Sequence, residues 1–236
     1  MIAKPQKQLI VLIGLIGFAF LGLSTLTLVK TVRSQEPTPP VTYADDAEAI
    51  RKGGLREAAR IRGHYVGFRT TSYFLKYDLE SLAAHSGNII IGSPIDNTVH
   101  LSANGQLITT WYRIKIRQAL KGKLQPNETV TVSLPGGKLT FEDGTSAEIK
   151  TPDLEGMQND RKYVLFLSPM LAVDGTFTVL GGSQGLFEIE NKTNLIKPNG
   201  HPLDPVRKHK DQAGDAFLKE IRAAVKKYPE ATTCCN

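Results

Sequence analysis

Cysteine is almost absent from this chain of 236 residues: the only two, Cys234 and Cys235, are adjacent and stand next to its end. They cannot build a disulfide framework across a domain, so we expect the core to be held together by packing. A lipid acceptor, a vicinal disulfide, an intermolecular link and a tail with no role in the fold remain open for this pair. The terminal Cys-Cys-Asn does not fit the prenylation pattern.

Acidic residues are missing from the first 33 positions, which contain Lys4, Lys7, Lys30 and Arg33. The whole chain has 29 Lys and Arg against 23 Asp and Glu, so 25 against 23 remain outside this basic stretch. The remainder is nearly balanced in charge, which argues against nucleic acid as a partner.

A long apolar run is confined to one place, residues 9–29, where 21 residues pass without a charge. About 20 apolar residues suffice for a helix to cross a bilayer. A cleavable signal usually has a shorter apolar region, of roughly 7–15 residues, followed by a small-residue cleavage site. We therefore predict a transmembrane anchor at 9–29, a cytoplasmic N-terminus at 1–8 and the remainder outside the cytoplasm. Secretion after signal cleavage is the alternative.

The region after the apolar run changes character twice. Residues 30–44 are polar and rich in proline, which predicts a semi-rigid spacer. Residues 45–80 favour a preface of short helices and a strand, with Asp45 and Asp46 as a helix start. Gly53-Gly54 lowers helix propensity, so two short helices are expected rather than one long helix. A further short helix is expected at 77–87, with Asp78 as its cap.

Residues 81–190 have the pattern of β-structure. Asn104-Gly105 is a strong hairpin signal. Alternation of apolar and polar residues predicts half-buried antiparallel strands, with these side chains facing inward: Tyr112, Ile114, Ile116, Val130, Val132 and Leu134. The continuous apolar run 163–167 predicts a strand covered on both faces. Strands at this spacing predict a mainly β fold, a small antiparallel barrel, with a β-sandwich as the alternative.

The last part of the chain is predicted to be a polar linker at 191–210, an amphipathic helix at 211–229 and a tail at 230–236. Asp211 is the expected helix cap, and Phe217 and Ile221 belong to an apolar stripe. So narrow a stripe favours packing on the domain's own sheet.

Five segments carry a resemblance to a known family, and they lie at 81–92, 112–122, 130–137, 163–169 and 181–189. Together they resemble the OB-like barrel of the tissue-inhibitor-of-metalloproteinases and netrin-module superfamily, most closely uncharacterised bacterial secreted or anchored proteins. The resemblance implies a small extracytoplasmic barrel that binds another molecule. The inhibitors present an N-terminal cysteine to the zinc of their target, and no cysteine precedes the barrel here, so that chemistry is not implied.

Residues 181–185 spell G-x-S-x-G around Ser183, the pattern of the nucleophile elbow in hydrolases. An elbow needs a strand, a sharp turn and then a helix, whereas 186–190 alternates like another strand. The glycines are therefore expected to turn the chain between two strands, and no catalytic residue is assigned. The five histidines lack the spacing of metal ligands, and no motif for a cofactor is present.

One strand face is the candidate ligand-binding surface. Arg113, Lys115 and Arg117 alternate along 112–122, and Trp111 shares their face by parity. OB barrels bind oligomers across such a face, often with an aromatic platform, and the cations favour an anionic ligand. An ordinary solvated face that prevents edge pairing is the alternative.

These patterns predict an extracytoplasmic, membrane-anchored binding module for a protein or an anionic envelope polymer, without catalysis, metal or cofactor. Two other functions stay open: an extracytoplasmic hydrolase whose site is not visible in the sequence, and a structural component of an envelope assembly.

Overall fold

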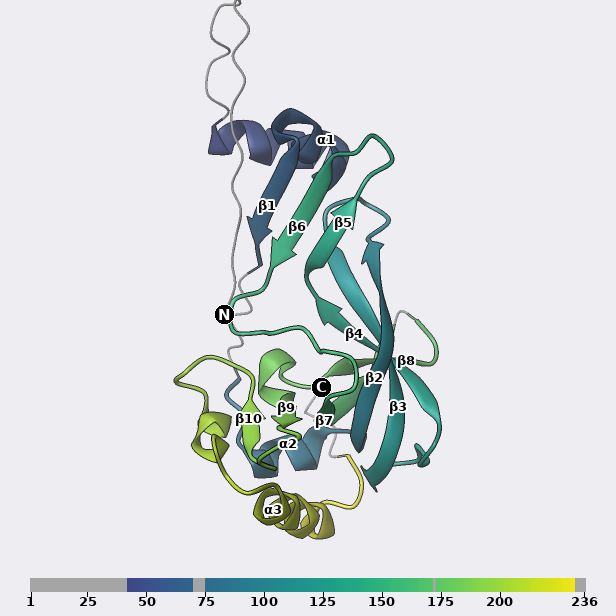
Figure 1. Ribbon diagram of the computed structural model, residues 1–236, viewed down its shortest axis with the longest axis vertical. Coiled ribbons are helices and arrows are strands. Elements are labelled where there is room, and N and C mark those ends of the chain that lie inside the picture. The colour runs from purple at the N-terminus through teal and green to yellow at the C-terminus, as the bar shows by residue number, and fades with distance from the viewer. Residues whose placement is uncertain (1–41, 70–74, 172, 232–236) are drawn as a thin grey trace, which may run out of the picture. The chain divides into compact units, whose positions relative to one another are not determined.

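The computed structural model describes residues 42–69, 75–171 and 173–231, which form a mainly β structure with two sheets (Figure 1). The helices are α1 (Tyr43–Arg62), α2 (Leu79–His85), α3 (Gly214–Lys227) and the 3₁₀ turns η1 (Gly182–Gly185) and η2 (Pro205–His209). The strands are β1 (His64–Phe68), β2 (Asn88–Leu101), β3 (Ile108–Lys121), β4 (Thr129–Pro135), β5 (Gly137–Thr140), β6 (Ser146–Lys150), β7 (Lys162–Pro169), β8 (Thr176–Val179), β9 (Leu186–Ile189) and β10 (Ile196–Pro198).

The larger sheet closes on itself. Strands β7, β2, β3, β4 and β8 are neighbours in that order, and β8 pairs back onto β7. We call these five strands the ring. Its pairs are antiparallel except for β4 with β8, which run parallel, so the predicted purely antiparallel barrel is wrong at this one pairing. The parallel pair arises because the chain crosses from β7 to β8 to complete the ring.

The first half of strand β2 and most of strand β7 are buried on both faces. On β7, Tyr163, Leu165 and Leu167 join the apolar cluster inside the ring. Val164 and Phe166 point to the other side and pack with α2 and α3. This confirms the prediction that the apolar run 163–167 is covered on both faces.

The smaller sheet has the order β1-β6-β5, with β1 and β6 parallel. Together with α1 it forms what we call the cap. Its core contains Leu55, Ala59, Phe141 and Ala147 and extends to Ile108 of the ring. The structure therefore assigns β5 and β6 to a second sheet, whereas the predicted barrel at 81–190 included both.

Helix α1 is two short helices joined by a kink, as Gly53-Gly54 predicted. Gly54 has φ 71° and ψ −165°, a conformation that is essentially restricted to glycine. Arg62 forms two hydrogen bonds with Asp46, at 2.6 and 2.7 Å. Residues 16 apart in a straight helix lie about 24 Å from each other, so this ion pair requires the chain to reverse at the kink. The β2–β3 hairpin contacts α1 at the kink, where the Leu55 amide donates to the Gly105 carbonyl at 2.7 Å.

Two predictions near the C-terminus are wrong. The segment 191–210 is not a linker, because it contains β10 and η2 and buries Ile196 and Val206. Asp211 does not cap α3: it has φ 62° in a turn, and the helix follows Ala213 as N-cap. The start of α3 is fixed instead by the Gly214 amide, which donates to the Asn194 carbonyl at 2.7 Å.

No helix within the described ranges is long and apolar enough to span a bilayer. The predicted anchor at 9–29 lies outside those ranges, as do the basic residues around it and Cys234 and Cys235.

Candidate functional site

The four predicted surface residues share the outer face of β3. Their neighbours Tyr112, Ile114 and Ile116 are buried inside the ring, while Arg113 and Arg117 are exposed and Trp111 and Lys115 are half-buried. The alternation therefore places the aromatic ring and the three cations in one row, as predicted. Strand β3 lies between β2 and β4, so residues of three strands border this row.

The charge of the row is smaller than the sequence suggests. Arg113 pairs with Asp96 of β2, with its Nε at 2.8 Å from one carboxylate oxygen and Nη2 at 2.5 Å from the other. These hydrogen bonds raise the pKa of Arg113 and lower the pKa of Asp96. Lys115 donates to the backbone carbonyl of Asn127. Lys115 and Arg117 are thus left without a carboxylate partner among the described residues.

Trp111 has an aromatic neighbour that the sequence did not indicate. Its ring lies 4.1 Å from the ring of His100, at an interplanar angle of 32°. The His100 Nε2 is 2.8 Å from the Thr98 hydroxyl, which holds the imidazole in place. The indole Nε1 is buried and has no hydrogen-bond partner among the described residues. His100 and Asp96 could not be found from the sequence because β2 pairs with β3 through register shifts.

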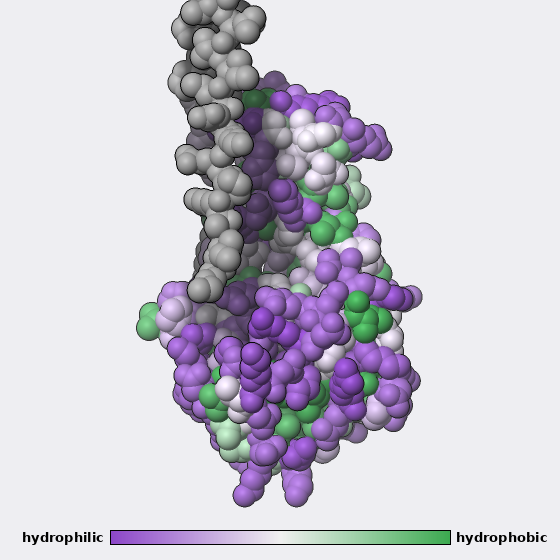
Figure 2. Space-filling model, viewed as in Figure 1, coloured by the Kyte–Doolittle hydropathy of each residue, from purple (hydrophilic) through white to green (hydrophobic). Residues whose placement is uncertain are grey.

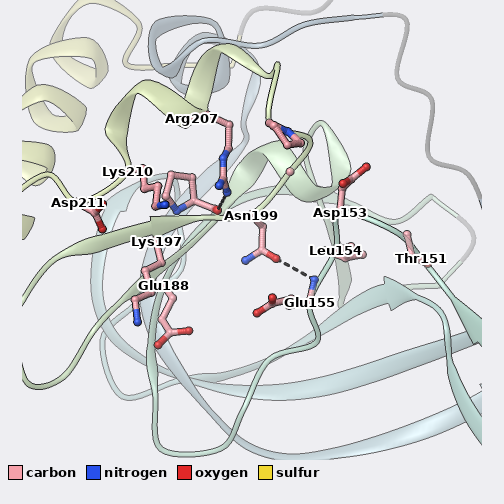
Figure 3. Close-up of a pocket in the computed structure, with 13 residues that line it drawn as sticks. Thr151, Asp153, Leu154, Glu155, Glu188, Lys197, Asn199, Arg207, Lys210 and Asp211 are labelled. Carbon is pink, nitrogen blue, oxygen red and sulfur yellow. Dashed lines mark hydrogen bonds between the residues drawn. The ribbon is translucent and has the colours of Figure 1, made fainter.

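A second feature is a polar cavity of about 510 Å³, which the predictions missed (Figure 3). It is bounded by the loop after β6, by β9 and β10, and by the chain around η2. Most of its cationic wall comes from the segment that had been predicted to be a linker. The Asn199-Gly200 pair is a turn signal in that segment.

Charges of both signs line this polar cavity. Glu188 pairs with Arg161 at 2.7 Å, and Lys197 pairs with Glu190 at 2.6 Å. These ion pairs raise the pKa of Arg161 and of Lys197. Of the cations that line the cavity, Lys197 is thus already paired, and Arg161, which lies outside the lining, neutralises Glu188.

The centre of the polar cavity is formed by Asn199 and Arg207. The Asn199 side-chain oxygen accepts from the Glu155 amide at 2.9 Å, and Arg207 donates to the Pro198 carbonyl at 2.5 Å. Both side chains point toward the middle of the cavity in Figure 3. The amide nitrogen of Asn199 and the rest of the guanidinium can donate to a polar ligand, and no aromatic side chain is among the described lining residues.

Ser183 lies in η1, between β8 and β9. Both strands pair with β7, β8 at residues 167–169 and β9 at residues 162–165, so the turn joins two strands along one edge. This confirms the prediction that strand, and not helix, follows the G-x-S-x-G pattern. Ser183 is buried, and neither a histidine ring nor a lysine hydrogen bonds to its hydroxyl in the described part of the chain.

An acidic residue nevertheless lies near Ser183. A Cβ placed on Gly200 would be 2.8 Å from the Asp204 carboxylate and 3.6 Å from the Ser183 hydroxyl, so both groups border the same glycine. Asp204 is buried and accepts from Lys76 at 2.5 Å and from the His201 backbone amide at 2.9 Å. Its carboxylate is thus engaged by groups other than an imidazole.

Within the described ranges, no three His, Cys, Asp or Glu side chains cluster in a way that could hold a metal ion. No protein-family model matches the chain, and no curated protein matches its sequence.

Proposed function

We propose that this protein is an extracytoplasmic, membrane-anchored binding module that engages a protein or an anionic envelope polymer through the outer face of β3. It has no catalytic activity in this proposal. The anchor is the segment 9–29, which has the length and flanking charges of a membrane span.

The path of the ring supports the OB-like part of the proposal. Its first three strands, β2, β3 and β4, are consecutive and antiparallel. The fifth strand, β8, lies between the third strand β4 and the fourth strand β7. A closed five-stranded barrel of this kind binds oligomers on the face of its second and third strands, here β3 and β4.

The observation that carries the proposal is the row formed by Trp111, Lys115 and Arg117. An aromatic ring and two cations on one strand face suit a ligand that combines a flat apolar surface with negative charge, because stacking and charge attraction then act together. Both cations lack a carboxylate partner among the described residues, so their attraction for a ligand is not already satisfied. An acidic glycan or an acidic patch on a protein has this chemistry.

The test is cross-linking of the full-length protein in its own membrane, followed by recovery of whatever is attached. The informative variant is Lys115→Glu with Arg117→Glu, which leaves the Arg113–Asp96 pair intact. Its matched control is Lys219→Glu with Arg222→Glu, which changes the charge equally on the exposed side of α3.

The proposal predicts that a partner or polymer is recovered with the native chain and the control and is lost with the β3 variant. Binding should also weaken as salt is raised, since salt screens charge attraction at the protein surface. Equal recovery with all three proteins would contradict the assignment of β3.

A hydrolase is the second candidate, because Ser183 and Asp204 both border Gly200. A fluorophosphonate probe labels activated serines. Labelling of the native chain that disappears in Ser183→Ala would support the hydrolase and count against a module without catalysis.

A further inference from the structure

An apolar cavity of about 520 Å³ lies where the ring meets the cap, apart from the outer face of β3. Tyr112 and Leu134 reach it from the inside of the ring, and Phe68 and Ile149 reach it from the cap. Leu154, in the loop that follows β6, completes the apolar lining. Figure 2 shows hydrophobic atoms at the surface between the two sheets, bordered by hydrophilic ones.

Phe68 is the unusual residue of this apolar cavity. Its side chain is 71% exposed although it lines an apolar space, and Val66 on the same face of β1 is 37% exposed. Burial of an aromatic side chain is favourable, and the fold leaves this contribution unused at Phe68. Exposed apolar side chains beside a cavity of ligand size are typical of a binding site.

The rim of the apolar cavity is basic. Lys138, Glu148 and Lys150 line it, with Lys138 directly across from Glu148 on the neighbouring strand. Glu148 is 3.8 Å from Lys150, whereas Lys138 forms no ion pair within the described residues. One cation at the rim is therefore available to an anionic group.

We propose that this apolar cavity binds the hydrocarbon chain of a single-chain anionic amphiphile, a fatty acid. The chain lies against Phe68, Tyr112 and Leu134, and the carboxylate is placed at the rim near Lys138. The volume is within the range of sites for small molecules. A protein or glycan would use the outer face of β3, so the two sites are independent.

The experiment uses the full-length protein in its membrane and a fatty acid that carries a photoreactive diazirine in its chain. After irradiation, the labelled peptides are mapped by mass spectrometry. Competition with dodecanoate, and separately with dodecyltrimethylammonium, reports the preferred charge of the head group.

The variants test the two parts of the lining. Phe68→Ser removes an exposed ring, and Leu171→Ser is the matched control because Leu171 is fully exposed and does not line the cavity. Lys138→Glu reverses the rim charge, and Lys219→Glu on α3 is its control.

The expected label lies in peptides that contain Leu134–Lys138 or Pro152–Gly156. Labelling should fall about tenfold in Phe68→Ser and about threefold in Lys138→Glu, stay unchanged in both controls, and be displaced by dodecanoate alone. Label confined to other peptides, equal labelling of Phe68→Ser and Leu171→Ser, or equal displacement by the cationic amphiphile would each overturn the proposal.

Discussion

The ring buries both faces of its central strands, whereas the cap buries one face of a three-stranded sheet. Five consecutive residues of β7, Tyr163–Leu167, are buried, whereas no residue of β5 is buried. The ring can therefore rely on bulk burial, which tolerates modest changes in side-chain shape. The cap has a small core and depends on a few specific contacts: the reversal of α1, the glycine at its kink and the pairs between charged side chains.

The largest effect is expected in the packing between the ring and its helices. Phe166 is fully buried and meets Phe187 edge to face, with ring centroids 5.7 Å apart. Phe166→Ala should lower the free energy of unfolding by about 3–5 kcal/mol. Phe68→Ala in the cap should change it by less than about 0.5 kcal/mol, since that ring is mostly exposed. Chemical denaturation measures both, and similar losses would contradict the comparison.

The next largest effect is expected at the α1 kink. A Cβ at Gly54 would lie 2.5 Å from the Gly105 carbonyl oxygen, in addition to the unfavourable φ of 71°. Gly54→Ala should therefore destabilise the cap by about 3–4 kcal/mol. Gly63 has φ 72° with nothing within 4 Å, so Gly63→Ala isolates the backbone cost, about 1–2 kcal/mol. If the two variants lose the same free energy of unfolding, the contact between the hairpin and α1 does not stabilise the cap.

A smaller effect is expected when the ion pair that closes α1 is weakened. Asp46 is buried, and its hydrogen bonds raise the pKa of Arg62. Asp46→Asn should lower the free energy of unfolding by about 1–2 kcal/mol. Glu48→Gln removes an exposed pair with Lys52 on the same helix and should leave the unfolding midpoint nearly unchanged. Equal unfolding midpoints for both variants would show that the buried pair is dispensable.

The smallest effect is expected in the pH dependence of stability that Asp143 contributes. Hydrogen bonds from Thr145, together with Arg60 of α1, lower the pKa of Asp143 to about 2. A folded-state pKa below the usual 3.8 means that the stabilisation is complete above that value and is lost as the pH falls toward 2. Asp143→Asn should thus lower the unfolding midpoint at pH 6, and the difference should shrink as the pH falls through about 2. A constant difference between the two proteins across this range would exclude the carboxylate as its source.

The local patterns of the sequence predicted the ring well. Alternation along β3 and the apolar run of β7 depend on which side chains meet water, and short-range periodicity reports that directly. Asp78 caps α2 as predicted, since its carboxylate accepts from the Ser81 amide at 2.8 Å. A cap of this kind is a contact three residues away and can be recognised locally.

Long-range pairings could not be predicted. β6 joins the cap because it pairs with β1, about 80 residues earlier, in parallel, and nothing in either segment encodes that partner. The segment 191–210 looks polar because its core side chains, Ile196 and Val206, are few among asparagines, prolines and charged residues. The candidate surface on β3 was predicted from the sequence of that strand alone. Asp96, which pairs with Arg113, belongs to β2, so this ion pair could be identified only once the pairing of β2 with β3 was known.

The most direct test of the two-region account is native-state amide hydrogen exchange of the full-length protein, read peptide by peptide. The account predicts slow exchange in β2, β3 and β7 and faster, collective exchange in β1, β5 and β6, with Gly54→Ala accelerating the cap strands alone. Equal protection of cap and ring, or acceleration of both by Gly54→Ala, would show that the two regions unfold as one unit and would contradict it.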